Sequence, residues 1–190
     1  FNGHRLFLDR FVRTAAFTLS STERRLYDAV TEYVENQSER AAAKGERGRL
    51  LGFTLALLQR RLASSVRAIR RSLERRHKRL TVLQEHLEEL QERIEIPEDL
   101  SDLPEEEQWE IESKLERFTV AETRGELELE CRELAKLITL AKEAERGEEE
   151  TKLQRLRQLL TEEGLFRSKT KLLVFTEHRD TLDYLVEKFE

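Results

Sequence analysis

The sequence has few of the features that cross-link a chain or place it in a membrane. Its 190 residues contain a single cysteine, Cys131, so no disulfide can form within the chain. No apolar run approaches the roughly 20 residues that a helix needs to cross a bilayer. Phe1 is not an initiator methionine, and the sequence has no charged-then-apolar signal segment that would explain a processed start. We therefore expect a soluble, cytoplasmic protein, without membrane contact, that is part of a longer chain.

The composition favours a mainly α fold. Hydrophobic residues make up 38% of the chain and charged residues another 38%. This balance is typical of solvated helices around narrow apolar seams rather than of a deeply buried core.

Two short stretches are typical of β-strands. Residues 11–19 alternate loosely between apolar and polar positions and end at Ser20 and Ser21. Leu172–Phe175 is a run of four apolar residues, as expected for a parallel strand covered on both faces. Leu182, Leu185, Val186 and Phe189 then recur at helical spacing. Since one strand cannot make a sheet, we expect partner strands outside residues 1–190.

Residues 20–65 are predicted to form two helices. Ser20-Ser21-Thr22-Glu23 has the form of a capping box, which indicates a helix start. The apolar stripe of this helix should run to Val34, so that the helix ends near Glu35 and is followed by a frayed end and loop over residues 41–48. From Arg49 to Leu62 apolar residues nearly surround the next helix, which predicts burial on more than one side. Ala63-Ser64-Ser65 breaks the pattern.

The middle of the chain resembles an antiparallel coiled coil. An apolar seam with steps of three and four runs from Val66 to Ile94, and Arg76 interrupts it. A helix of this length would extend about 43 Å and should project into solvent. Pro97 ends it, and residues 101–107 have the composition of a new helix start. Stripes over 111–141 and 153–165 then predict an antiparallel return arm and a final helix.

Three segments, in this order, resemble the Swi/Snf-like helicases of superfamily 2: residues 17–30, residues 57–65 and residues 171–180. The first resembles the end of the first RecA-like lobe and the linker helix that leaves it. The second resembles a helix that begins the second lobe, and the third resembles the strand and turn of the fourth helicase motif. The helical region between them is similar to the protrusions that family members carry.

The resemblance implies four parts. These are the end of a first RecA-like α/β lobe at 1–20, linker helices and the start of a second lobe at 21–65, a coiled-coil-like protrusion at 66–165, and the first strand and helix of a truncated second lobe at 166–190. The chain has no Gly-rich loop ending in Gly-Lys-Ser/Thr, no Asp-Glu box and no Gln-x-x-Gly-Arg-x-x-Arg motif. No ATP site, catalytic residue or cofactor is therefore expected in this segment, and by resemblance the parent protein would bind ATP and magnesium.

Basic residues are concentrated around the predicted start of the seam. Residues 60–79 contain nine basic residues and one acidic residue. Residues 1–93 hold 19 basic and 12 acidic side chains, whereas residues 94–190 hold 15 and 27. Such a stripe is suited to DNA phosphates, and the residues that we assign to nucleic-acid contact here are Arg60, Arg61, Arg67 and Arg71. Two alternatives stay open: acidic residues of 105–150 pair with the stripe, or Arg60 and Arg61 stabilise a helix end.

The turn after the predicted strand at Leu172–Phe175 is a second candidate phosphate site. Thr176, His178 and Arg179 lie where this strand passes into its helix, and backbone donors there can hold a phosphate with help from side chains. The alternative is that Thr176 caps the helix and that Arg179 pairs with Asp180 or Asp183. The four histidines do not have metal-ligand spacing, so no metal site is predicted. Cys131 fits a small core residue.

These observations predict an internal fragment of an ATP-dependent DNA translocase or helicase. Its protrusion would contact duplex DNA or a protein partner, and its ends would join the remaining parts of the motor lobes. The alternative function is a non-enzymatic coiled-coil scaffold that dimerises and recruits proteins, which the heptad spacing alone also fits.

Overall fold

The computed structural model describes residues 12–85, 107, 110–111, 114–115, 119–147, 150–164 and 171–189. The helices whose bounds are described are α1 (Ser21–Ala42), α2 (Gly45–Ser64), α3 (Val66–Glu85), α5 (Arg124–Arg146), α6 (Thr151–Glu162) and α7 (Arg179–Phe189). Residues 107, 110–111 and 114–115 are also helical, and none of the described residues forms a strand. The prediction of a mainly α fold is confirmed. The predicted helix end at Pro97 and residues 101–106 of the predicted helix start lie outside the described residues, as do residues 86–94 of the predicted seam.

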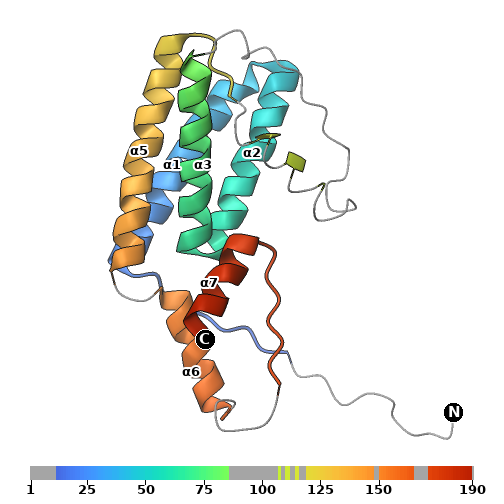
Figure 1. Ribbon diagram of the computed structural model, residues 1–190, viewed down its shortest axis with the longest axis vertical. Coiled ribbons are helices and arrows are strands. Elements are labelled where there is room, and N and C mark those ends of the chain that lie inside the picture. Colours follow the sequence, from blue (N-terminus) through green and yellow to red (C-terminus); the bar gives the residue numbers. More distant parts are fainter. Residues whose placement is uncertain are drawn as a thin grey trace, which may run out of the picture.

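Four of the helices form a bundle. α1, α2, α3 and α5 run alternately up and down, so that each packs against antiparallel neighbours (Figure 1). Their inward faces share one hydrophobic core, which includes Leu26, Leu58, Ile69, Leu73 and Leu134. The shorter helices α6 and α7 lie beyond the end of this bundle at which α1 begins and α2 ends (Figure 1).

The predicted start of α1 is confirmed in detail. The Glu23 backbone amide donates to Ser20 Oγ over 3.3 Å, and the Ser20 amide donates to Glu23 Oε2 over 2.7 Å, which completes the capping box. The helix continues seven residues beyond the predicted end at Glu35. It does so because Gln37 and Ala41 are buried against the bundle and because alanine favours helix. The predicted loop over 41–48 shrinks accordingly to Ala43 and Lys44.

A single residue separates α2 from α3. Ser65 is extended, with φ −161° and ψ 156°, and its Oγ accepts a hydrogen bond of 3.1 Å from the Ala68 amide in the first turn of α3. The predicted break at residues 63–65 therefore lies at a residue that ends one helix and caps the next. Leu51, Leu55, Leu58 and Leu62 are buried along one face of α2, whereas Phe53 is 41% exposed, so the predicted burial on more than one side is not confirmed.

The coiled-coil protrusion is not confirmed, although α3 and α5 are antiparallel neighbours as predicted. Both helices belong to the four-helix core, and the seam residues Val66, Ile69, Leu73, Leu80 and Leu83 are buried in it. Helices assigned to the linker (21–65) and to the protrusion (66–165) thus share one core. Heptad spacing predicted one packing partner for α3 because it cannot distinguish a two-helix seam from a bundle face.

The two predicted strands are not confirmed. Residues 12–20 and 171–176 have no regular secondary structure, and their chains lie close to α6 and α7 (Figure 1). Leu173 and Phe175 on one side of this segment are 79% and 90% exposed, whereas Leu172 and Val174 on the other side are about half covered, so the described residues fully cover neither side.

The predicted apolar face of α7 is not its packing face. Leu182, Val186 and Phe189 are exposed and Leu185 is half-buried, whereas Thr181 and Tyr184 are buried. The helix takes this orientation because its contacts with α2 and α3 are polar, as the next section describes.

Candidate nucleic-acid interface

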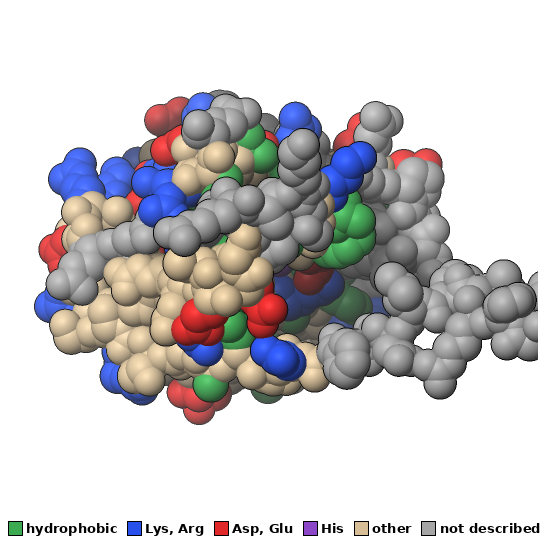
Figure 2. All heavy atoms as spheres, turned by 90° about the horizontal axis from the view of Figure 1, so that it is seen from below, with side chains coloured by type: hydrophobic (Ala, Val, Ile, Leu, Met, Phe, Trp, Pro, Cys, Tyr) green, Lys and Arg blue, Asp and Glu red, His purple; other side chains and the backbone are tan. Residues whose placement is uncertain are grey.

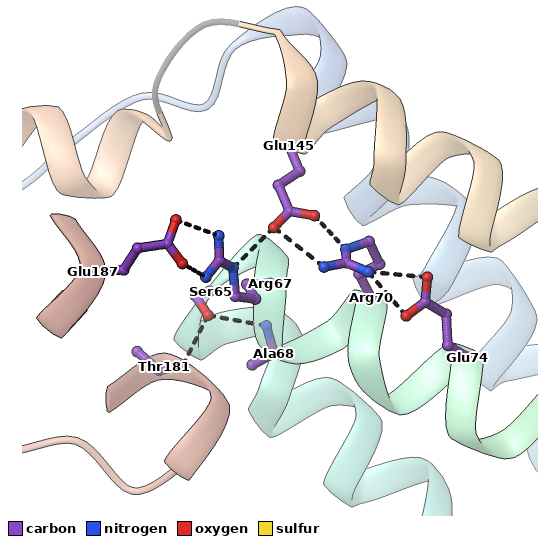
Figure 3. Close-up of polar contacts among 8 residues, drawn as sticks. All are labelled: Ser65, Arg67, Ala68, Arg70, Glu74, Glu145, Thr181 and Glu187. Carbon is purple, nitrogen blue, oxygen red and sulfur yellow. Dashed lines mark hydrogen bonds and ion pairs between the residues drawn. The ribbon is translucent and has the colours of Figure 1, made fainter. Parts of the chain in front are cut away.

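The structure brings together chain segments more than 100 residues apart at one end of the bundle. Arg60, near the end of α2, forms an ion pair with Glu177 in the turn before α7. The hydroxyl groups of Ser64 and Ser65 lie 2.7 and 2.8 Å from Thr181 Oγ1 in the first turn of α7. The end of α2, the start of α3 and the start of α7 therefore form one junction, part of which is drawn in Figure 3.

Two arginines of α3 extend this junction to α5. Arg67 Nε donates to Glu145 Oε1 over 2.9 Å, and its other nitrogens pair with Glu187 of α7. Arg70 pairs with the same Glu145 and donates to both oxygens of Glu74 at 3.0 and 2.9 Å (Figure 3). Burial opposes ionisation of Glu145, but these hydrogen bonds lower the pKa of its carboxyl below the ordinary value. Glu145 thus joins α5 to α3 through Arg67 and Arg70, and Arg67 joins both helices to α7.

Two further arginines of the basic stretch are buried. Arg61 donates to Ser72 Oγ within the junction of α2 and α3. Arg76, which interrupts the predicted seam, is fully buried and pairs with Glu130 of α5. Burial opposes the charge of Arg76, but contact with Tyr33 and Glu130 raises the pKa of its guanidinium. Because Arg61 and Arg76 are bound inside the bundle, they do not contribute to the positive charge on the surface of residues 60–79.

One face of α3 carries a row of cations along a cleft. We call this row the cationic stripe and define it as Arg67, Arg71, Arg75 and Lys78. The cleft has a volume of about 400 Å³ and is lined by the stripe together with Glu74, Asp180 and Asp183. Arg75 pairs with Asp180 over 3.0 Å. Arg71 and Lys78 are exposed and make no hydrogen bond or ion pair with any residue that the structure describes.

The view from the α6 and α7 end shows how charge is distributed there. Among the residues that are coloured, lysine and arginine side chains lie scattered among aspartate and glutamate side chains, with smaller apolar areas between them (Figure 2). Mixed charge of this kind gives local contact sites for an anion rather than one broad field.

The residues of the second candidate site take different positions around this junction. Thr176 is half-buried, His178 is buried and Arg179 is exposed. The His178 carbonyl accepts hydrogen bonds of 3.0 Å from the amides of Thr181 and Leu182, so His178 precedes the first turn of α7 and Thr176 does not cap it. Asp180, one of the two partners considered for Arg179, pairs with Arg75 instead.

All seven candidate residues thus lie at or beside the junction of α2, α3 and α7. The structure adds Arg75 and Lys78, which sequence reasoning counted as basic but did not select, and the acidic partners Asp180 and Glu187. The spacing of the basic residues could have identified Arg75 and Lys78, because residues 67, 71, 75 and 78 repeat at steps of four and three and therefore share a helix face. Arg67, Arg70 and Arg76 follow the alternative in which acidic residues of 105–150 pair with the arginines, because Glu145 pairs with the first two and Glu130 with the third.

The described residues contain no group of three or more His, Cys, Asp and Glu side chains arranged to hold a metal ion. Cys131 is buried, as predicted for a core residue, and burial raises the pKa of its thiol. None of the described helices has the length and apolar character required to span a bilayer.

Comparisons of this chain with protein-family models, with curated proteins and with solved structures found no match.

Proposed function

We propose that this chain is an internal segment of an ATP-dependent DNA translocase or helicase similar to the Swi/Snf family. In this proposal α1 and α2 lead from the first lobe to the start of the second, residues 171–189 continue the second lobe, and the helices between them, α3, α5 and α6, form an appendage that contacts duplex DNA. ATP and magnesium would be bound by other parts of the parent protein, because the residues that such a site needs are not in this sequence.

The observation that carries the proposal is the contact between the second and third segments of the resemblance. Residues 57–65 and 171–180 are joined by the ion pair of Arg60 with Glu177 and by the hydroxyl contacts of Ser64 and Ser65 with Thr181. Two elements of one lobe should lie side by side even when a long insertion separates them in the chain. Their contact here supports the assignment of both to one lobe.

The exposed segment before α7 gives a second line of support. Leu172–Phe175 is extended, apolar and exposed, and such a surface is rare on an isolated domain. A parallel strand of a RecA-like sheet would bury these side chains between helices on both faces. The exposure of Leu173 and Phe175 fits a strand whose sheet is completed by another part of the parent protein.

The mechanical role follows from this arrangement. If the junction belongs to the second lobe, closure of the two lobes on ATP would move the cationic stripe relative to any DNA contact on the first lobe. The bundle itself would not react with ATP. It would transmit movement because its core helices pack tightly against one another.

The alternative function, a dimerising coiled-coil scaffold, is less well supported. The seam residues of α3 are covered by the other helices of the bundle, so a parallel dimer through this seam would require the bundle to open. A concentration-dependent dimer in sedimentation would favour the scaffold, whereas a monomer at all concentrations favours the proposed appendage.

The proposal is tested by titrating the chain with a labelled DNA duplex at several salt concentrations. We expect binding that weakens steeply with salt, and we expect the double variant Arg71→Ala/Lys78→Ala to lower the log-log salt slope by about 2. Arg24→Ala/Lys136→Ala is the matched control, because it removes two exposed cations from α1 and α5. Absent or salt-independent binding, or equal effects of the two variants, would contradict the proposal.

A further inference from the structure

Helices α3 and α7 face each other with opposite charges in matching order. Arg67 near the start of α3 pairs with Glu187 near the end of α7, and Arg75, two turns further along α3, pairs with Asp180 at the start of α7. The two helices therefore run antiparallel along the cleft. Asp183 lines the cleft between these pairs, and we define Asp180, Asp183 and Glu187 as the acidic face of α7.

The attachment of α7 to the bundle is mainly polar. Thr181 contacts the hydroxyl groups of Ser64 and Ser65, and the Tyr184 ring lies 4.9 Å from the Arg67 guanidinium carbon. Leu182, Val186 and Phe189 are partly exposed, and Leu185 lines a pocket with Leu153 and Leu156 of α6. Since apolar burial supplies most of the free energy that holds helices together, α7 should be displaced from α3 more easily than the helices of the four-helix core.

The ion pairs that hold α7 are partly accessible to solvent. The Glu187 side chain is 57% exposed, and the Arg75 and Asp180 side chains are 31% and 26% exposed. Such pairs are weak and are screened by salt. A stronger polyanion that reached Arg67 and Arg75 could therefore replace the carboxylates of α7.

We propose that the phosphate backbone of duplex DNA and the acidic face of α7 compete for the cationic stripe. In the DNA-free chain α7 pairs with Arg67 and Arg75, and only Arg71 and Lys78 are open to a phosphate. DNA first contacts these two cations and then takes over the other two as α7 moves away. This inference rests on the proposed function, because it assumes that the stripe is a DNA contact.

The dimensions of the stripe suit this partner. Lys78 follows Arg67 by 11 residues, so the stripe extends about 16 Å along the helix. One strand of a duplex advances about 3.4 Å per phosphate, so a row of this length can face about five phosphates. Four cations in one row are enough to give a marked salt dependence once α7 has left, whereas the two open cations alone give a shallower one.

The competition is tested by removing charge from α7 rather than from α3. Asp180→Asn/Glu187→Gln removes the α7 carboxylates from Arg75 and Arg67, while Arg67 keeps its hydrogen bond to Glu145 and Arg75 keeps its hydrogen bond to Ser72. This variant should tighten duplex binding about fivefold to tenfold at low salt. Glu143→Gln/Glu163→Gln is the matched control, because it changes net charge by the same amount and breaks two exposed ion pairs on α5 and after α6, with Arg25 and Arg13. This control should change affinity by less than about twofold. Circular dichroism of both variants confirms that the helices are retained.

Hydrogen exchange gives a readout that does not depend on charge changes. On addition of duplex DNA to the natural chain, amide exchange should become faster in residues 181–189 of α7 and should not change in α5. Tighter binding of the α7 variant than of the control, with faster exchange in α7, supports the inference. If the natural chain binds DNA but the two variants bind equally, or α7 becomes more protected, the inference is wrong and the proposed function stands. If no version binds DNA, both are wrong.

Discussion

Arg76 of α3 and Glu130 of α5 form an ion pair inside the bundle, with Nη2 and Oε1 2.5 Å apart and side chains that are 0% and 1% exposed. Tyr33 of α1 completes the group: its hydroxyl donates to Glu130 Oε1 over 2.9 Å and accepts from Arg76 Nε over 3.0 Å. Thr119 donates to the second oxygen of Glu130 over 2.7 Å. Three helices of the bundle are thus joined by polar contacts in a region that excludes water.

Removal of one member of this pair should destabilise the chain strongly. Glu130→Ala leaves the Arg76 guanidinium buried without its carboxylate, which should lower the free energy of unfolding by about 3 to 5 kcal/mol. Urea denaturation followed by circular dichroism measures this change. The double variant Arg76→Met/Glu130→Leu removes both charges and should lose less than Glu130→Ala alone. A double variant that is less stable than the single one would contradict this account.

The capping box at the start of α5 should contribute measurably to stability. Thr123 accepts a hydrogen bond of 3.3 Å from the Glu126 amide, and Glu126 accepts one of 3.2 Å from the Thr123 amide. Thr123→Ala should cost about 1 kcal/mol in urea denaturation, and Thr123→Ser should cost much less. Thr139→Ala, in the exposed middle of the same helix, is the control and should change stability by less than about 0.5 kcal/mol.

Glu150 should make stability depend on pH with a sign opposite to that of the paired carboxylates. Burial raises the pKa of its carboxyl from 4.5 to about 7, and the nearby Glu23 adds to this shift. Between these values the folded protein holds a proton that the unfolded chain has lost, so the contribution of this group falls as pH rises. Glu23 and Glu145 have lowered pKa values, and their contributions are lost as pH falls.

The variant Glu150→Gln isolates this effect because glutamine imitates the protonated carboxyl. At pH 4.5 the variant and the natural chain should be about equally stable, whereas at pH 8 the variant should be more stable by about 1 to 3 kcal/mol. Urea denaturation at the two pH values measures the difference. Glu163→Gln removes one exposed carboxylate near the same helix and controls for the change in net charge. A difference that did not grow with pH would show that Glu150 ionises normally.

The exposed segment before α7 should tolerate truncation of its side chains. Leu173→Ala should change the free energy of unfolding by less than about 0.5 kcal/mol, because Leu173 is 79% exposed. Leu58→Ala is the matched control and should cost about 2 to 5 kcal/mol, because Leu58 is buried in the core. In a longer chain that completes the sheet, Leu173→Ala should become costly, which links this measurement to the proposed function.

Features that depend on neighbouring residues in the sequence were predictable. The start of α1 at Ser20 and Glu23 and the break at Ser65 follow from local hydrogen bonding, and both are confirmed. The capping box at Thr123 and Glu126 follows the same pattern. Local rules succeed here because the partners of each hydrogen bond are three residues apart.

Features that depend on distant partners were not predictable. Arg76 was recognised as an interruption of the seam, but its partner Glu130 lies 54 residues further along the chain and belongs to another apolar stripe. The face that α7 turns to the bundle was also missed, since Leu182 and Val186 have the stronger hydrophobic pattern. Thr181 is selected instead by the two serines at the end of α2, which only the tertiary structure brings near.

The short connections between the first three helices bear on how the chain assembles during synthesis. α1, α2 and α3 are consecutive and joined by two residues and one residue, so most of their contacts are local and should form early. At that stage Arg76 has no carboxylate beside it, and its charge must remain hydrated. We expect water to remain around Arg76 in the partly synthesised α1–α3 unit until α5 packs and places Glu130 beside this arginine. Because α5 is synthesised after α3, the packing of α5 is the step that excludes water from the core around Arg76.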